Sequence, residues 1–207
     1  MTQLDEAART SLTPLDDAGR TSLFYGARTS NTFADTPVTD AELTEIWELA
    51  KWPPTAANTQ PLRVVFVRSA EGKARLLPHM AEGNVAKTDS APVTAILAVD
   101  KDFHEFIPEL LPFRPEMKDA LAADAAARDG MGRFNATLQI GYFIMAIRAV
   151  GLAAGPMAGF DNAGVDAEFF PDGRLASLLV VNIGHPGENP WFDRLPRLDA
   201  GTTVEFV

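Results

Sequence analysis

The hydrophobic pattern of the chain switches repeatedly between helical and extended spacing. In "TDAELTEIWELAKW", apolar residues recur every three or four positions, and Thr39 and Glu42 have the spacing of a capping box. This pattern predicts a helix from about Asp40 to Trp52. Residues 62–68, "LRVVFVR", are instead rich in β-branched and aromatic side chains, which predicts a buried strand.

The same alternation continues along the middle of the chain. Ser69 is placed to cap a second helix, which Pro78 should end or bend. "APVTAILAVD", ending at Asp100, is short and almost continuously apolar, which is typical of a strand buried on both faces. Residues 101–129 have a helical composition, but they are broken by Pro108, Pro112 and Pro115. We therefore interpret this segment as a mobile cover or an insertion.

The C-terminal half predicts one long helix and two strands. "NATLQIGYFIMAIRAVGL" is apolar on nearly every face, with Asn135 as its start and Gly151 as its end, which indicates a central helix in the core or at a subunit interface. "LASLLVVNIGH" predicts an inner strand, and "TTVEFV" at residues 202–207 alternates like an exposed strand. Helices and strands are interspersed without strict βαβ order. We predict an α+β fold with a mixed central sheet flanked by helices, in one domain over residues 1–207.

Composition limits the partners of such a fold. The chain has 207 residues, a formal net charge of −10 and no cysteine. The charge argues against nucleic acid or an anionic membrane as a partner, because that binding needs clustered Lys and Arg. The absence of cysteine excludes disulfides and thiolate sites. The N-terminus lacks the apolar core of a signal peptide, and no apolar run is long enough to span a membrane. We expect a cytoplasmic protein that acts on a small-molecule substrate.

The common motifs of nucleotide binding and hydrolysis are missing. G-x-G-x-x-G, the Walker loop and G-x-S-x-G do not occur. His79, His104 and His185 lie far apart without a second ligand at helical spacing, so we predict no metal site. The acids at Asp16 and Asp17, and those in residues 161–172, are interpreted as turn and helix-start residues. No side chain is assigned as a catalytic acid or base.

Polar clusters at five turns carry the main functional signal, through their joint order. They are "ARTSN", "PPTAANTQP", "EGNVAKT", "AAGPMAGF" and "RLPRL". In this order, from about Arg28 to Arg197, they resemble the nitroreductase family of FMN-dependent oxidoreductases. The pattern is most similar to the branch that contains the malonic-semialdehyde reductase of pyrimidine catabolism, through "KWPPTAAN", "GN" followed by "KT", "FNATLQIGYFIMAIRAVGL", "GPMAGFD" and "LPRL".

The resemblance implies an assembly as well as a fold. The family forms an α+β sandwich in an intertwined homodimer, with two FMN molecules at the subunit interface. We therefore expect a homodimer in which "TTVEFV" adds to the partner's sheet. Residues 101–130 would form a lid or insertion, with Phe103, His104, Phe106 and Phe113 as lid residues or as a merely structural aromatic cluster.

Residues near both ends of the chain are implied in binding the FMN phosphate. A group with nearly two negative charges favours guanidinium donors, which Arg28 and Arg197 would supply. Ser30 would add a hydroxyl and Thr29 a nearby backbone group. Arg194 is a further candidate, so either both of these C-terminal arginines or Arg197 alone would reach the phosphate.

A further pair is implied at the pyrimidine edge of the flavin ring. Reduction places negative charge near N1 and the adjacent carbonyl, so this edge requires donors. Asn84 and Lys87 match the family's amide and lysine for this role, and their spacing places them on one helix face. The chain departs from many nitroreductases in having Thr32 near a position where they carry a lysine, which affects the expected redox poise and electron acceptor.

The "GPMAGF" loop is implied to approach the ring with its backbone. Glycine and proline suit a chain that must come close to a flat ring. In the family a backbone N–H of this loop bonds to flavin N5, and here that N–H belongs to Ala158 or Gly159. Pro156 and Met157 would line one side of the ring.

The polar loop before the first strand is implied to cross to the other subunit. Its residues Pro54, Thr55, Ala56 and Asn58 would contact the flavin ring and ribityl chain bound by the neighbouring subunit. Where many relatives have two serines, this chain has Thr55 and Ala56, so one hydroxyl is kept and one is lost.

The implied activity depends on the cofactor. An FMN-dependent oxidoreductase of this kind passes hydride from NADH or NADPH through flavin N5 to a small acceptor, by a ping-pong mechanism. A malonic-semialdehyde-like aldehyde, a quinone and a nitro compound are the candidate acceptors. The alternative is a flavin-binding protein without turnover, such as a sensor or a store. Neither the acceptor nor the choice between NADH and NADPH follows from the sequence.

Overall fold

The computed structural model describes residues 13–207 as helices packed around a small sheet. The strands are β1 (Leu62–Val67), β2 (Val93–Asp100), β3 (Ala153–Met157) and β4 (Leu175–Gly184). The α-helices are α1 (Asp17–Arg20), α2 (Asp40–Ala50), α3 (Ala70–Leu76), α4 (Glu82–Ser90), α5 (Ile107–Leu110), α6 (Met117–Ala123), α7 (Ala125–Ala149), α8 (Asn162–Phe169) and α9 (Ala200–Thr203). Tighter or wider helical turns are η2 (Thr21–Tyr25), η3 (Ala56–Asn58), η4 (Leu77–His79) and η5 (Phe103–Phe106). None of the helices in this part of the chain is long and apolar enough to cross a membrane.

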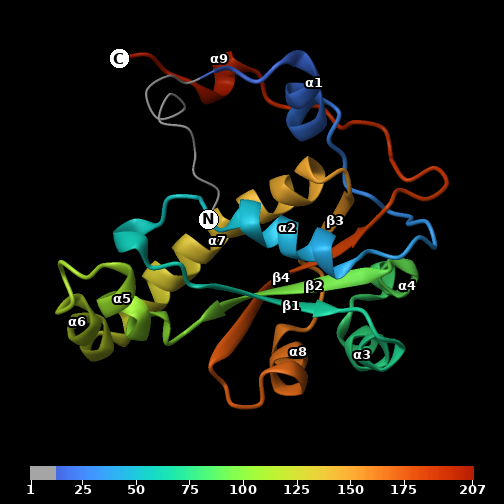
Figure 1. The fold of residues 1–207 in the computed structure, drawn as a ribbon. Coiled ribbons are helices and arrows are strands. Elements are labelled where there is room, and N and C mark those ends of the chain that lie inside the picture. Colours follow the sequence, from blue (N-terminus) through green and yellow to red (C-terminus); the bar gives the residue numbers. More distant parts are fainter. Residues whose placement is uncertain (1–12) are drawn as a thin grey trace.

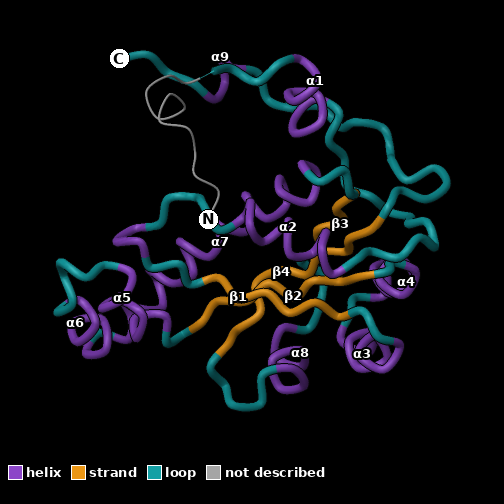
Figure 2. Tube along the Cα trace, in the orientation of Figure 1, coloured by secondary structure: helices purple, strands orange, loops and turns teal. Residues whose placement is uncertain are grey.

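The four strands form one sheet in the order β1-β2-β4-β3, shown in orange in Figure 2. Each neighbouring pair is antiparallel, and the register places Leu62 opposite Val99 and Ala153 opposite Gly184. All eight residues of β2 are buried, as expected for a strand covered on both faces. The α+β class is therefore confirmed, but the sheet formed by the described chain is antiparallel rather than mixed.

Helices cover both faces of this sheet (Figure 1). On one face, α2 and α7 pack together over a core that includes Ile46, Phe143 and Leu97. On the other face, α3 and α8 enclose a second core that includes Ile96 and Val165. The sandwich of two helical layers around a sheet follows from strands that are apolar on both sides.

Local capping signals fix two of the helices. The Thr39 hydroxyl accepts a hydrogen bond from the Glu42 N–H, and the Glu42 carboxylate accepts one from the Thr39 N–H, so the predicted capping box is present. The Ser69 hydroxyl accepts from the Gly72 N–H at 3.0 Å and caps α3 as predicted. The helix predicted to end at Trp52 stops at Ala50 instead, shortly before two prolines.

The predicted start of the long helix was wrong. α7 begins at Ala125, ten residues before Asn135, and its first turn is capped by the Asp124 side chain. Gly132 lies inside this helix, where a Cβ would come to 3.0 Å from the Phe103 ring. Asn135 is a buried residue within α7.

Two segments adopt structures other than those predicted. "GPMAGF" was interpreted as a loop approaching a ring, but its first three residues belong to strand β3, which is paired along its length with β4. "TTVEFV" was predicted to be a strand. Its first two residues belong to α9, and residues 204–207 have no regular structure and are exposed.

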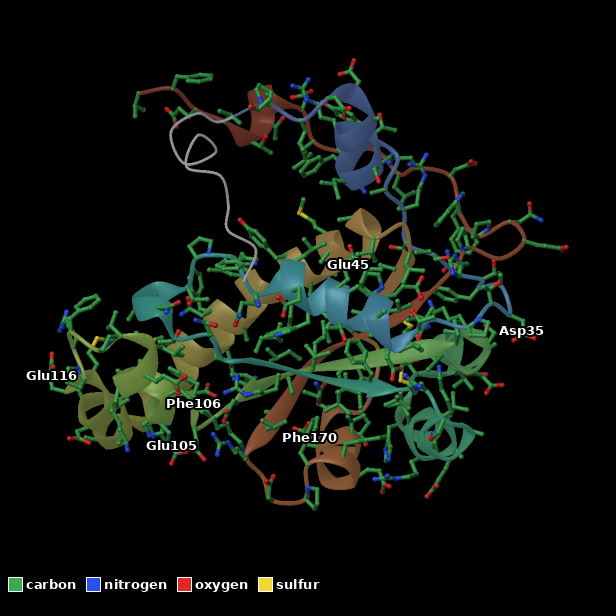
Figure 3. The ribbon with its side chains drawn as sticks, viewed as in Figure 1. Asp35, Glu45, Glu105, Phe106, Glu116 and Phe170 are labelled. Carbon is green, nitrogen blue, oxygen red and sulfur yellow. The ribbon has the colours of Figure 1, made fainter. Side chains whose placement is uncertain are left out.

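The segment between β2 and α7 packs at one end of the sheet, where Figure 3 labels Glu105 and Phe106. It has its own small apolar cluster, which includes Ile107 and Leu121. Phe103 and His104 are 1% and 7% exposed, so they are not available as lid residues in this conformation. Phe106 lies against the guanidinium groups of Arg63 and Arg174, and Phe113 is exposed.

Candidate cofactor site

Four arginines from distant parts of the chain line one open cavity of about 630 Å³. Arg28 follows η2, Arg148 lies in the last turn of α7, and Arg194 and Arg197 belong to the C-terminal segment. Thr29 also lines this arginine cavity. The rest of the lining is acidic, polar or apolar, and consists of Leu23, Phe24, Ala27, Asn31, Phe192, Asp193 and Leu195. The fold thus concentrates positive charge in an acidic protein.

The arginines of this cavity disfavour one another's charge. Burial, followed by the charge of Arg194, lowers the pKa of the Arg148 guanidinium. Desolvation and the charges of Arg28 and Arg197 lower the pKa of Arg194. Arg28 Nη1 is buried and has no hydrogen-bond partner within residues 13–207. An anion among these side chains would relieve the repulsion and satisfy the buried donor, and a phosphate group has the charge and acceptors to do both.

Backbone contacts hold the two arms of this cavity together. Arg194 Nη2 donates to the carbonyl oxygens of Tyr25 and Ala27, the latter at 2.9 Å. Arg197 Nη1 donates to the Leu195 carbonyl at 2.9 Å. Both C-terminal arginines line the cavity, and Arg194 also ties the C-terminal segment to the N-terminal one.

Ser30 occupies a different position from the one expected for a phosphate ligand. Its side chain is fully buried, and its hydroxyl donates to the Thr32 carbonyl at 2.9 Å. The Ser30 N–H donates to the Ala154 carbonyl at 2.9 Å, which joins this segment to the start of β3. From there β3 runs towards a second cluster of residues, on α4 and in the chain after β3. The five residues of the strand separate the two clusters by roughly 13 Å.

This second cluster brings α4 against the chain that follows β3. Asn84 Nδ2 donates to the Gly159 carbonyl at 2.8 Å, and the Ala81 N–H donates to the same oxygen at 3.1 Å. Asn84 and Lys87 lie on α4, as their spacing predicted. A Cβ on Gly159 would lie only 2.8 Å from Asn84 Nδ2, so the absence of a side chain permits this close approach.

The predicted ring-contacting residues of "GPMAGF" differ in their accessibility. Pro156 is half-buried, and Ala158 and Gly159 are exposed. Met157 is 6% exposed, and its sulfur lies 3.8 Å from both Thr88 Oγ1 and Asn182 Nδ2. Its side chain therefore belongs to the core.

The loop that contains η3 has an unusual backbone. Ala57, Asn58 and Gln60 all have positive φ, at 53°, 52° and 43°, although none is glycine. Such conformations cost about 1 kcal/mol or more each, and they persist only where the surroundings impose them. They cluster at functional sites, so this strained loop is a candidate binding element.

Side chains from α7 impose that conformation. Asn135 Oδ1 accepts from the Ala56 N–H at 2.7 Å, and Gln139 Oε1 accepts from the Leu62 N–H at 3.0 Å. Because the two amides are four residues apart, they share one face of the helix and hold both ends of the loop. Asn58 Nδ2 donates to the Leu110 carbonyl at 2.9 Å, which links the loop to α5.

Within one chain, the strained loop and the α4 cluster are separated. Figure 1 draws the loop beside α5, at the opposite end of the sheet from α4. The predicted residues therefore form two groups. One group lies along β3, with the cavity residues at one end and the α4 cluster at the other, and it consists of Arg28, Thr29, Arg194, Arg197, Asn84, Lys87 and residues 156–159. The other group lies in the strained loop beside α5, and it consists of Pro54, Thr55, Ala56 and Asn58.

The comparison with family models shows which family the chain belongs to. Residues 25–185 match the model described as the Nitroreductase family. This chain belongs to the nitroreductase family. Two relatives, one from Streptomyces coelicolor and one from Streptomyces griseus, are provisionally named NADH dehydrogenase/NAD(P)H nitroreductase. The first is 64% identical, covering 86% of this chain and 88% of the relative, and the second is 54% identical, covering 93% and 98%.

Solved structures agree with this family assignment at the level of the fold. A protein from Exiguobacterium sibiricum, described as a complex with FMN, aligns with a TM-score of 0.80 over 96% of this chain and 100% of its own, at 19% identity. A nitroreductase family protein from Streptococcus pneumoniae aligns with a TM-score of 0.77 over 87% and 96%, at 23% identity. These likenesses confirm the α+β nitroreductase fold.

Sequence reasoning missed three residues of this candidate site. Arg148 appeared only as a charge that interrupts an apolar stretch, although a single arginine inside a buried helix was itself a signal. Asn135 was interpreted as a helix start, and its role as a clamp was invisible without the tertiary structure. Gln139 had no local signal, because its partner, the Leu62 N–H, lies 77 residues away.

Proposed function

We propose that this nitroreductase is an FMN-dependent oxidoreductase that uses NADH or NADPH. One observation carries the proposal, namely the convergence of Arg28, Arg148, Arg194 and Arg197 on one cavity in a chain of net charge −10. Arg28 Nη1, which is buried without a hydrogen-bond partner within residues 13–207, and the close approach at Gly159 fit a phosphate at one end of β3 and a flat ring at the other. FMN has both groups.

Each cluster would then serve one part of the cofactor. The four arginines and Thr29 would hold the phosphate, and Asn84 and Lys87 would donate to the pyrimidine edge of the ring. The exposed backbone at Ala158 and Gly159 would face the central ring. Bound FMN supplies hydride transfer between a nicotinamide and a second substrate. The described side chains orient and expose the ring, and none is required as a nucleophile.

The nicotinamide and the acceptor would use the same exposed face in turn, which gives ping-pong kinetics. A malonic-semialdehyde-like aldehyde, a quinone and a nitro compound remain the proposed acceptor classes. The aldehyde follows from the resemblance to the malonic-semialdehyde reductase branch, and the nitro compound from the names of the relatives. Such chemistry fits a cytoplasmic protein supplied with reduced nicotinamide.

The functional unit would be a homodimer with FMN at the subunit interface. Phe134, Leu138 and Tyr142 are 64%, 42% and 47% exposed, and their spacing makes one apolar stripe along α7. A second copy would cover this stripe and place its strained loop near the ring held by the first. Residues 204–207 would then add to the partner's sheet, and the segment 101–130 would act as a lid or insertion.

Spectroscopy of the purified protein tests the cofactor. We expect the oxidised protein to show flavin absorption, to release FMN on denaturation, and to bleach when NADH or NADPH is added without oxygen. A colourless protein that takes up no added FMN would refute the proposal. Comparing turnover of malonic semialdehyde, a quinone and a nitroarene with each nicotinamide would then identify the substrates.

The same experiment separates the non-catalytic alternative. A sensor or store would bind FMN but remain oxidised in the presence of both nicotinamides. Double-reciprocal plots at several acceptor concentrations test the mechanism, because parallel lines are expected for ping-pong kinetics and intersecting lines would contradict it.

A further inference from the structure

A lysine ammonium is buried beneath the α4 cluster. Lys73 lies on α3 and is only 7% exposed. Its Nζ donates to the Thr88 carbonyl at 2.5 Å and to Thr94 Oγ1 at 2.6 Å. No carboxylate within residues 13–207 forms a salt bridge with it. A buried cation without a paired anion is costly, so a purely stabilising role explains this residue poorly.

The ammonium begins a buried chain of hydrogen bonds that ends on α4. Thr94 Oγ1, which accepts from Lys73, donates to Asn182 Oδ1 at 2.8 Å. Asn182 Nδ2 then donates to the Lys87 carbonyl at 3.0 Å. Thr88, Thr94 and Asn182 are all fully buried. The chain of contacts therefore joins α3, β2 and β4 to the last turn of α4.

These contacts satisfy carbonyl groups that an isolated helix end would leave without partners. The carbonyls of Lys87 and Thr88 lie in the last turn of α4, where a helix has no further N–H donors of its own. A cation at that end is also favoured by the helix dipole. At the other end, Ala81 provides no side-chain cap, and the contacts of α4 there run to the Gly159 carbonyl.

We propose that Lys73 is a positioning residue for the cofactor site, acting through α4 on Asn84 and Lys87. The inference rests on the proposed function, because those two side chains are assigned to the pyrimidine edge of FMN. With Lys73 in place, the end of α4 is fixed to the sheet, and the donors of Asn84 and Lys87 keep a constant distance from β3. The ammonium also adds buried positive charge at the end of α4, the helix whose Asn84 and Lys87 are assigned to the edge where reduction places negative charge.

Replacing Lys73 tests this role. Lys73→Met keeps the length of the side chain and removes its charge and donors, whereas Lys73→Gln keeps donors without charge and provides a second variant if Lys73→Met does not fold. Lys101→Met is the matched control, because Lys101 is exposed and lies outside the α4 network. The measurements are the FMN dissociation constant, the midpoint potential of bound FMN and the melting temperature of the FMN-free protein.

We expect Lys73→Met to weaken FMN binding about tenfold, since at least one donor to the ring edge is misplaced, and a lost hydrogen bond of this kind is worth roughly that factor. The midpoint potential should become more negative in both Lys73 variants and stay unchanged in Lys101→Met. An unchanged FMN affinity and potential would overturn the proposal, even if the melting temperature fell, because Lys73 would then serve only the fold. A wild-type protein that binds no FMN would instead refute the proposed function itself.

Discussion

Arg148→Gln should separate phosphate binding from folding more clearly than any other change in the arginine cavity. The side chain is half-buried, and burial together with Arg194 lowers its pKa, so its charge is unfavourable in the FMN-free protein. Removing that charge should leave the free energy of unfolding unchanged or raise it. The same change should weaken FMN binding, because a hydrogen bond between a guanidinium and a phosphate is lost.

The magnitude follows from the charge on both partners. A hydrogen bond to a charged group contributes about 1.5 to 3 kcal/mol, which corresponds to a rise of roughly ten- to 150-fold in the FMN dissociation constant. Riboflavin has the same ring and ribityl chain without the phosphate. Its affinity should therefore be the same in the wild type and in Arg148→Gln.

The assay is flavin fluorescence titration of the FMN-free protein with FMN and with riboflavin, together with urea unfolding. Arg133→Gln is the control, because Arg133 is an exposed residue of the same helix whose partner is Asp129. It should change neither affinity. An equal loss of FMN and riboflavin binding in Arg148→Gln would refute the reasoning, as would a loss of stability with FMN binding intact.

Three further predictions concern other parts of the molecule. Gly159→Ala should weaken FMN retention, because the new Cβ would displace Asn84, and it should change the melting temperature little. Flavin content and thermal unfolding of the purified variant test this prediction, and full retention of FMN would contradict it. Asn135→Leu should lower the free energy of unfolding by about 1 to 3 kcal/mol in urea titrations, because the Ala56 N–H loses its buried acceptor; an unchanged midpoint would contradict the clamp. Burial lowers the pKa of Lys73 from 10.5 to about 8, so the unfolded chain binds more protons between these pH values, and this group should make stability rise over that interval by at most about 3 kcal/mol. Lys73→Met should lack this rise, and an equal change in the free energy of urea unfolding between pH 8 and pH 10 in the wild type and in Lys73→Met would contradict it.

The sequence predicted those elements whose signals are local. The caps at Thr39 and Ser69 depend on residues three positions away, and β1, β2 and β4 depend on continuous apolar runs. The helical spacing of Asn84 and Lys87 is of the same kind. In each case the residues that determine the structure are neighbours in the sequence, so the pattern contains the information.

Elements that tertiary contacts determine were not predictable in this way. Gly155 and Pro156 argue against a strand, yet β3 forms because β4 supplies an antiparallel partner along its whole length. Gly155 is required there, since a Cβ would lie 2.8 Å from the Ser30 carbonyl oxygen. Arg148 lines the same cavity as Arg28 because of the way α7 packs. The spacing of residues along the chain does not predict that packing.

The strained loop refines the interpretation of its own sequence. Its density of polar groups first suggested contacts with a cofactor, but many of those groups serve the loop itself. The Gln60 N–H donates to Thr55 Oγ1, and Gln60 Nε2 donates to Asn58 Oδ1 at 2.9 Å. Polar composition alone is therefore weak evidence for a ligand. The stronger evidence is the backbone conformation. Three residues other than glycine are held at positive φ, although glycine at these positions, or a shorter turn, would avoid the strain. A clamp from α7 that maintains such a conformation indicates that the loop must present this backbone to a ligand. In the proposed homodimer, that ligand is the flavin at the subunit interface.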